Sequence, residues 1–258
     1  MLSSHEWRTY YEDNARSLID IPWGLGAELT AAERTAIAAS VQDFQAGESS
    51  EGRHLLQYAR AYAARSGDHE YVEALRLFIA EEQRHARDLA RFLQLNGIPL
   101  VTSTFTDGVF RRLRQLFGGL EISISVLVTA EIIAKVYYAA LRDATGSTIL
   151  QTLCRQILQD EVRHVEFQVQ RLGMLRAARN AALRRTSMRL QRFLFWGTCL
   201  VVWIFHRRVF EQSRIDFRGF WRANWREFEA AFQSMQAVIA RLAAQSASGV
   251  WKPSLGNE

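Results

Sequence analysis

The sequence contains few residues that interrupt helices. Only 3 of its 258 residues are proline, so long helices can run without forced breaks. Alternation of apolar and polar residues, which is typical of strands, is nearly absent, and apolar residues recur with the helical period instead. The sequence therefore predicts an all-α protein with one large domain, although its length also allows two small ones.

Cysteine is scarce as well. Cys154 and Cys199 stand alone, without a CxxC pair, and this favours neither a disulfide framework nor a zinc ribbon. The first thirteen residues mix acidic and basic side chains and do not resemble a signal peptide. We therefore expect a cytoplasmic protein, with peripheral attachment to a membrane as a further option.

Acidic residues are rare in one part of the chain. Between Met174 and Arg226 there are twelve arginines but only two acidic residues, Glu211 and Asp216. This basic, aromatic-rich segment is predicted to meet an anionic partner: a membrane surface, an acidic protein or a nucleic acid. Nucleic acid ranks last because no nucleic-acid motif is present. The alternative is a solvated arginine face that only keeps packed helices soluble.

Residues 193 to 205 carry no charge at all. As a helix they span ~20 Å, which is short of the ~30 Å hydrocarbon core of a bilayer, so we expect no transmembrane span. A buried helix of the bundle is the favoured interpretation, and an interfacial membrane anchor is the alternative.

Capping and turn signals divide the chain into predicted helices. One helix begins at the capping box of Thr30 and Glu33 and runs to about Arg65, with a bend near Gly47. Asp107 is expected to cap a short helix. Longer helices are predicted over residues 68–94 and 120–143, from 147 to beyond 172, and over 183–209 and 220–244. The predicted units are an N-terminal extension (1–29), a four-helix bundle (30–173), C-terminal helices packed on it (174–247) and a frayed tail (248–258).

The pattern Glu-x-x-His occurs twice, at Glu82 and His85 and again at Glu161 and His164. Residues at i and i+3 share a helix face, so each pair can offer a carboxylate oxygen and an imidazole nitrogen to one metal ion. A single copy means little, because these residues are common on helix surfaces. The repetition gives the pattern its weight.

Each copy is preceded by a glutamate at a matching distance. Glu51 lies 31 residues before Glu82, and Glu131 lies 30 residues before Glu161. In each predicted hairpin both legs to the turn measure ~21–23 Å, so antiparallel packing brings the upstream glutamate level with the motif. Glu48 is a rival for Glu51, but its longer leg would misplace it by ~4–5 Å along the helix axis.

Two such hairpins packed together predict a dimetal site. Its four carboxylates would neutralise two divalent ions and so allow the filled site to lie in an apolar interior. Glu131 lies in a nearly uncharged run and needs a partner; an ion pair with Lys135 is the alternative to metal. The predicted ligands are Glu51, Glu82, His85, Glu131, Glu161 and His164.

Several neighbours of these residues have predicted roles too. Glu81 and Asp160 are expected to lie off the ligand face, where either can accept a hydrogen bond from a ligand histidine. Tyr58 and Tyr138 are expected to fill the core rather than act in redox chemistry. His54 is expected at the surface.

The two motifs resemble those of the non-haem diiron carboxylate proteins of the ferritin-like superfamily. Glu81-Glu82-x-Arg84-His85 and Asp160-Glu161-x-Arg163-His164 are most similar to the motifs of acyl-carrier-protein desaturases and related diiron oxygenases. The resemblance covers residues 45–172. Diiron N-oxygenases carry an extra histidine four residues before the second motif's glutamate, and Ile157 at that position argues against that branch.

This resemblance implies a ferritin-like four-helix bundle with additional N-terminal and C-terminal helices. It also implies two iron ions bound by the six ligands above; manganese or a mixed Fe/Mn pair would suit the same ligands. The implied activity is a dioxygen-activating oxidoreductase that acts on a small apolar substrate and receives electrons from a donor protein. The alternatives are a rubrerythrin-like or ferritin-like protein that handles metal or scavenges peroxide, and a bundle that keeps the ligands for stability. A homodimer is compatible with each.

Overall fold

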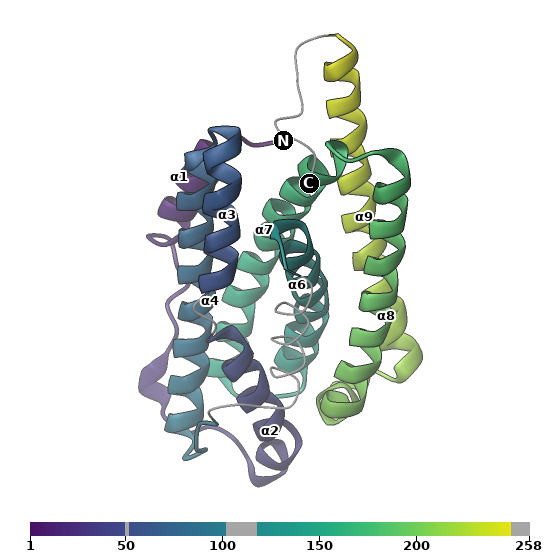
Figure 1. Ribbon diagram of the computed structural model, residues 1–258. Helices are drawn as coiled ribbons and strands as arrows, with labels where there is room; N and C mark the ends of the chain where they lie inside the picture. The colour runs from purple at the N-terminus through teal and green to yellow at the C-terminus, as the bar shows by residue number, and fades with distance from the viewer. Residues whose placement is uncertain (50–51, 102–117, 249–258) are drawn as a thin grey trace.

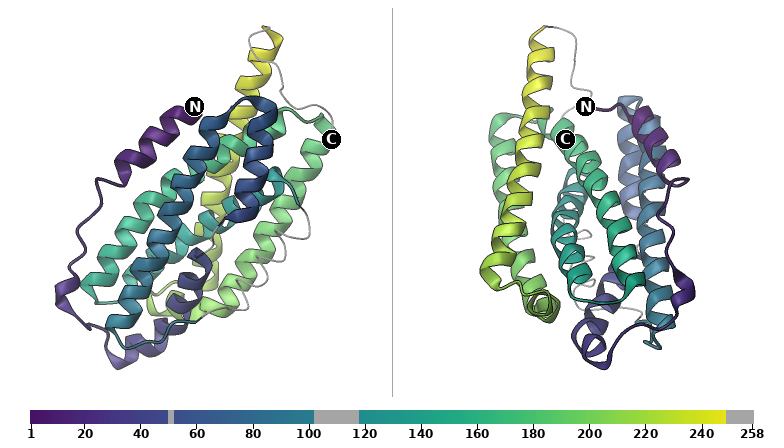
Figure 2. Two further views of the ribbon diagram at one scale, coloured as in Figure 1. Left: turned by 60° about the vertical axis from the view of Figure 1, so that its left-hand side comes forward. Right: turned by 180° about the vertical axis from the view of Figure 1, so that it is seen from behind.

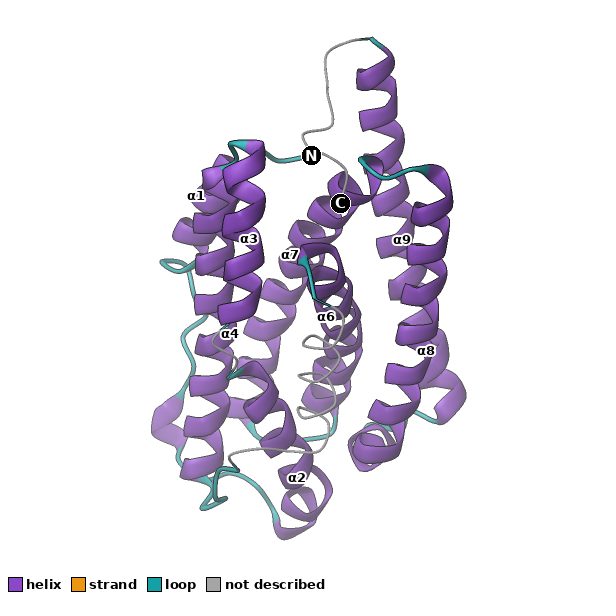
Figure 3. Ribbon diagram, viewed as in Figure 1, coloured by secondary structure: helices purple, strands orange, loops and turns teal. Residues whose placement is uncertain are grey.

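The computed structural model describes residues 1–49, 52–101 and 118–248, and within these ranges the only regular structure is helical (Figures 1 and 3). The all-α expectation is therefore confirmed. The predicted short helix at Asp107 lies outside the described residues. The helices are α1 (Ser4–Asn14), the 3-10 turn η1 (Trp23–Leu25), α2 (Ala31–Glu48), α3 (Arg53–Ser66), α4 (His69–Leu95), α6 (Leu120–Asp143), α7 (Thr148–Ala177), α8 (Ala181–Gln212) and α9 (Phe217–Ala247).

Polar side chains cap the starts of several of these helices. Thr30 and Glu33 form the predicted capping box at the start of α2. Asp68 and Ser147 accept backbone hydrogen bonds at the starts of α4 and α7, which satisfies N–H groups that have no partner within the helix. The turn before each cap reverses the chain, so α3 with α4 and α6 with α7 form two hairpins.

The helices lie in three layers (Figures 1 and 2). The α3–α4 hairpin, with α1 and α2 against α4, forms one side, and α6 and α7 form the middle. On the other side α8 packs against α6, and α9 packs against α7. The buried core includes the stacked aromatic pair Phe44 and Tyr137 and runs on to Phe210 in α8. The C-terminal helices thus extend the bundle.

The predicted single helix from Thr30 to Arg65 is wrong. The chain leaves α2 at Glu48 and re-enters a helix at Arg53, and Gly52 between them has a left-handed backbone with φ of +61°. A residue with a side chain is strained in that conformation. A side chain at Gly52 would also meet Ile79 of α4 at 2.5 Å. The break therefore combines a backbone that favours glycine with a close approach to α4.

Candidate metal centre

α2 ends at Glu48, one of the two glutamates that the sequence offers as the upstream ligand of the first motif. Glu48, in the last turn of α2, lies close enough to Glu82 and His85 for the three side chains to hold one ion, since one ligand atom from each lies within 4.8 Å of the others. The leg length that disfavoured Glu48 holds only for an uninterrupted helix, and α2 ends at Glu48. Glu51 lies outside the described residues, and its assignment as a ligand stays a prediction.

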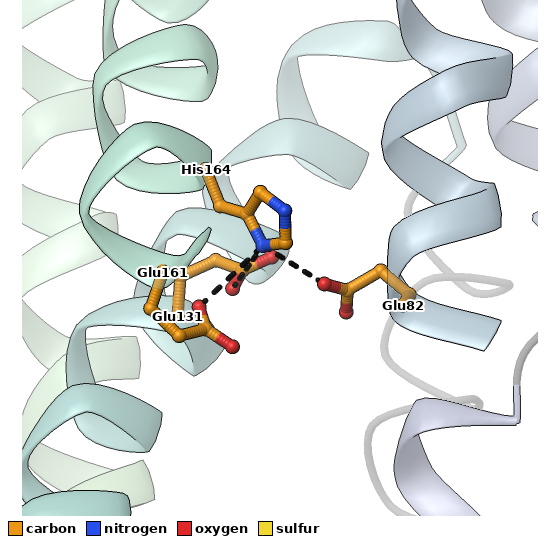
Figure 4. Close-up of side chains that lie close together, drawn as sticks. All are labelled: Glu82, Glu131, Glu161 and His164. Atoms are coloured by element: carbon orange, nitrogen blue, oxygen red, sulfur yellow. Dashed lines mark ion pairs between the residues drawn. The ribbon is translucent and has the colours of Figure 1, made fainter. Parts of the chain in front are cut away.

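A second group of ligand atoms meets beside the first. Glu82 from α4, Glu131 from α6, and Glu161 and His164 from α7 bring one ligand atom each within 4.8 Å of one another (Figure 4). Glu82 belongs to both groups. A carboxylate has two oxygens, so Glu82 could contribute a ligand atom to each of two ions if both groups were occupied.

Lys135 does not neutralise Glu131. It forms an ion pair with Glu227 of α9 instead, which removes the alternative considered from the sequence. Glu131 is 4% exposed and lies 3.8 Å from Nδ1 of His164.

The buried cluster contains polar atoms without hydrogen-bond partners. Nδ1 of His85, Nδ1 of His164, one oxygen of Glu82 and both oxygens of Glu161 make no hydrogen bond of regular geometry, although Nδ1 of His164 approaches Glu82 to 2.9 Å. Unsatisfied buried polar atoms are rare in folded proteins and call for an explanation. Carboxylate and imidazole donors that point at one another suit iron or manganese ions, so these residues fit a metal pair.

The remaining nitrogen of each histidine is held by a carboxylate from the opposite helix. Nε2 of His85 lies 3.0 Å from Asp160 on α7, and Nε2 of His164 lies 3.0 Å from Glu81 on α4. Such pairing fixes the ring orientation and leaves Nδ1 free to act as a ligand. Asp160 and Glu81 therefore take up the positions expected from the sequence.

Asn14 of α1 connects these two carboxylates. Its Nδ2 donates to Glu81 at 2.6 Å and to Asp160 at 2.8 Å. Arg84 also donates to Asp160. Burial alone would raise the pKa of Asp160, but the hydrogen bond and charge of His85 and the charge of Arg84 outweigh it and lower the pKa to about 2. The carboxylate is thus ionised when it holds His85. Nothing in the spacing of the sequence pointed to Asn14, because α1 reaches the site only through the tertiary fold.

The cluster concentrates negative charge in a buried place. Burial raises the pKa of Glu161 well above the ordinary carboxyl value, and the charge of Glu131 adds to this. Burial and then the charge of Glu82 do the same to Glu48. Burial favours neutral His164, but the charge of Glu82 and the hydrogen bond with Glu81 outweigh it and raise the pKa of His164 well above its ordinary value. Burial and the close approach of several carboxylates together produce these shifts.

Aromatic side chains surround the cluster. The rings of Phe78 and Tyr11 lie 4.7 and 6.2 Å from that of His164. Tyr138 donates a hydrogen bond to Glu48 at 2.7 Å in addition to filling the core, a contact that the sequence analysis missed because it favoured Glu51. His54 is exposed, as expected. These rings exclude water from the histidine side of the cluster.

These features define a class: a helical bundle of ferritin-like fold with a buried cluster of carboxylates and histidines that could hold metal ions. Solved structures share the fold. An R2-like ligand-binding oxidase with an aerobically reconstituted Mn/Fe cofactor has 19% sequence identity and a TM-score of 0.64, over 90% of this chain and 92% of that one. A valine-to-alanine mutant of an R2-like ligand-binding oxidase with an anaerobically reconstituted Mn/Fe cofactor also has 19% identity and a TM-score of 0.64, over 90% and 93%. No protein-family model and no curated protein matches the sequence.

Proposed function

We propose that this protein is a dioxygen-activating oxidase with a dinuclear metal centre, held by Glu48, Glu82, His85, Glu131, Glu161 and His164. The observation that carries the proposal is the convergence of carboxylate and imidazole ligand atoms from α2, α4, α6 and α7. Several of these atoms, on α4 and α7, are buried without a hydrogen-bond partner. The metal pair is two iron ions or one manganese and one iron, as in the Mn/Fe cofactors of the R2-like ligand-binding oxidases that share the fold.

The side chains have distinct tasks in this proposal. A bound pair of ions of this type supplies redox electrons and open coordination positions for dioxygen. Glu82 would contribute to holding both ions, because it belongs to both groups of ligand atoms. His85 and His164 are held in one orientation by Asp160 and Glu81. The substrate is small and apolar, and an electron-donor protein restores the reduced state.

Anaerobic loading with Fe(II), alone or with Mn(II), tests the proposal. We expect about two ions per chain by elemental analysis, in keeping with the two ligand groups, and uptake of dioxygen with a new optical absorption on exposure to air. Glu161→Ala should lose at least one ion, whereas Glu166→Ala, an exposed neighbour paired with Arg163, should keep both.

The outcomes separate this function from its alternatives. Binding of no metal by the wild-type chain would contradict the proposal. Two bound ions with no uptake of dioxygen would favour a bundle that keeps its ligands for stability. Steady oxidation of iron far beyond two ions per chain, or consumption of peroxide without an organic substrate, would favour the metal-handling or peroxide-scavenging alternative.

A further inference from the structure

α8 has one face inside the protein and one face outside. Its buried side chains include Phe195, Cys199 and Phe210, and His206 hydrogen-bonds to Ser40 of α2. The opposite face, here called the α8 apolar face, carries large hydrophobic side chains that are 41–65% exposed. They are Leu183, Leu190, Phe193, Trp196, Leu200, Ile204 and Phe205. The expectation that residues 193 to 205 form a buried helix therefore holds for only one side of it.

This exposure is concentrated in one place. Of the 14 large hydrophobic side chains that are exposed in the described ranges, 8 belong to α8 or to Phe217 at the start of α9. Single exposed apolar residues are normal on a soluble protein. A contiguous apolar patch instead marks a surface that contacts a partner or a membrane.

Arginines border the α8 apolar face. Arg185 and Arg189 lie before its central part, and Arg207 and Arg208 lie after it, all exposed. On the neighbouring helix α9, Arg218, Arg222 and Arg226 are exposed as well. Within the described ranges, the arginines of this segment that form ion pairs are Arg176, Arg179 and Arg226. The six other bordering arginines form no ion pair with a described residue. An apolar strip flanked by unpaired cations is complementary to anionic lipid, whose headgroups lie above an apolar layer.

A depression beside the α8 apolar face has the same chemistry. It has a volume of about 510 Å³ and lies where α8 meets the start of α9. Apolar and basic side chains line it together: Leu200, Phe217, Arg218, Trp221 and Arg222. Arginine binds phosphate through several donors at once, and the neighbouring rings can contact an acyl chain or glycerol backbone.

The geometry favours the surface of a bilayer over its interior. α6 and α8 are both long and apolar enough to cross a membrane, but 78% of the apolar window of α6 is buried inside the protein and α6 carries Glu131. The window of α8 is 39% buried, and its inner face is fixed to α2 and α6. Spanning a membrane would require α8 to leave these contacts, whereas lying on the membrane uses only the face that is already exposed.

A second copy of the chain fits this face less well. Both ends of the central apolar part of α8 are basic, so pairing two such faces along their length brings arginines of one copy against arginines of the other. Like charges brought together at an interface cost free energy. We propose that the α8 apolar face binds the surface of an anionic phospholipid bilayer, with the bordering arginines on the headgroups. This inference is independent of the proposed oxidase activity.

Vesicle co-sedimentation of the full chain tests this inference. The probes are vesicles of phosphatidylcholine alone and of phosphatidylcholine with phosphatidylglycerol. Each is measured at low salt and at about 0.5 M salt, which screens electrostatic attraction between the arginines and the headgroups. We expect binding to the anionic vesicles at low salt and a clear loss of binding in high salt. Equal binding to both vesicle types, or none to the anionic vesicles at low salt, would overturn the proposal.

Surface variants locate the binding face. Phe193→Ser with Ile204→Ser should weaken binding at least about tenfold, because two exposed side chains no longer enter the apolar layer. Arg207→Glu with Arg208→Glu should weaken it roughly 30-fold. The matched controls on other surfaces, Leu25→Ser and Arg16→Glu, should bind as the wild type does, and circular dichroism should show the same helix content throughout. If light scattering shows a dimer that the Phe193 and Ile204 changes dissociate, while vesicle binding is unaltered, the face binds a second copy and the proposal is wrong.

Discussion

Asn14 holds together the two carboxylates that orient the candidate ligand histidines. Its amide nitrogen is shared between Glu81 and Asp160, so Asn14→Ala leaves two carboxylates close together without their common donor. Loss of such an outer contact typically weakens metal affinity about 10- to 100-fold. Titration with Fe(II) or Mn(II) should show a loss of this size. Asp13→Ala, which changes an exposed neighbour paired with Arg16, is the control and should leave affinity unchanged. Equal affinity in Asn14→Ala would show that the histidines are oriented without it.

Glu48 and Glu51 offer competing assignments for the ligand upstream of the first Glu-x-x-His motif. Glu48 lies beside Glu82 and His85, so Glu48→Ala should reduce binding from about two ions to about one. If Glu48 is the ligand, Glu51→Ala should keep both ions. Elemental analysis of the two purified variants decides between them, and loss of an ion in Glu51→Ala alone would restore the assignment made from the sequence.

At the scale of the helices, Gly52 sets the break that brings Glu48 to the site. Gly52→Ala forces a side chain into a left-handed backbone and against Ile79, and we expect it to lower the free energy of unfolding by about 1–2 kcal/mol. Gly47 in α2 has open space where a side chain would lie, so Gly47→Ala should instead stabilise the protein by about 0.4–1 kcal/mol. Urea unfolding of both variants measures this difference. A change of the same sign in the free energy of unfolding of both variants would contradict this interpretation.

The break between α2 and α3 shows which features of the fold a sequence pattern can predict and which it cannot. Helices whose ends carry local capping signals were predictable, as at Thr30 and Asp68, because a cap depends on residues three or four positions apart. The paired motifs around Glu82 and Glu161 were predictable because the helical period fixes which residues share a face. The interruption at Gly52 was missed because a lone glycine inside a helical pattern has the same local signature whether the helix continues or stops.

Contacts between helices that are far apart in the sequence could not be predicted from local sequence patterns. The pairing of Lys135 with Glu227 joins α6 to α9, and Asn14 reaches the site from α1. Neither could be found from spacing, because each depends on how whole helices pack. Similarly, the uncharged run from 193 to 205 could be identified from composition, but which side of α8 would be covered depended on where α2, α6 and α9 lie.

At the scale of the whole molecule, the buried carboxylates make stability depend on pH. Glu48, Glu82 and Glu161 have raised pKa values, with burial as the first cause. An acid whose pKa is higher in the folded state keeps its proton better there than in the unfolded chain, so stability falls as pH rises above the ordinary value of 4.5. The raised pKa of His164 acts in the same direction, since its contribution is complete below 6.5 and is lost as pH rises through the raised value. The lowered pKa of Glu131 has the opposite effect, but its contribution to stability is lost only as pH falls below the ordinary value of 4.5.

Stripping the protein of metal should therefore expose a pH dependence that metal reverses. With a chelator present, we expect the Tm to fall between about pH 5 and about pH 8. Two bound divalent ions hold the carboxylates in their ionised form, and saturating Fe(II) or Mn(II) under anaerobic conditions should raise the Tm at the upper pH by roughly 5–10 °C. Scanning calorimetry of both forms at both pH values measures this.

Glu82→Gln with Glu161→Gln is the matched control: it keeps the side-chain shapes, removes two charges and should lose most of the response to pH and to metal. A stripped wild-type protein that is more stable at the higher pH would show that repulsion among these carboxylates does not control its stability.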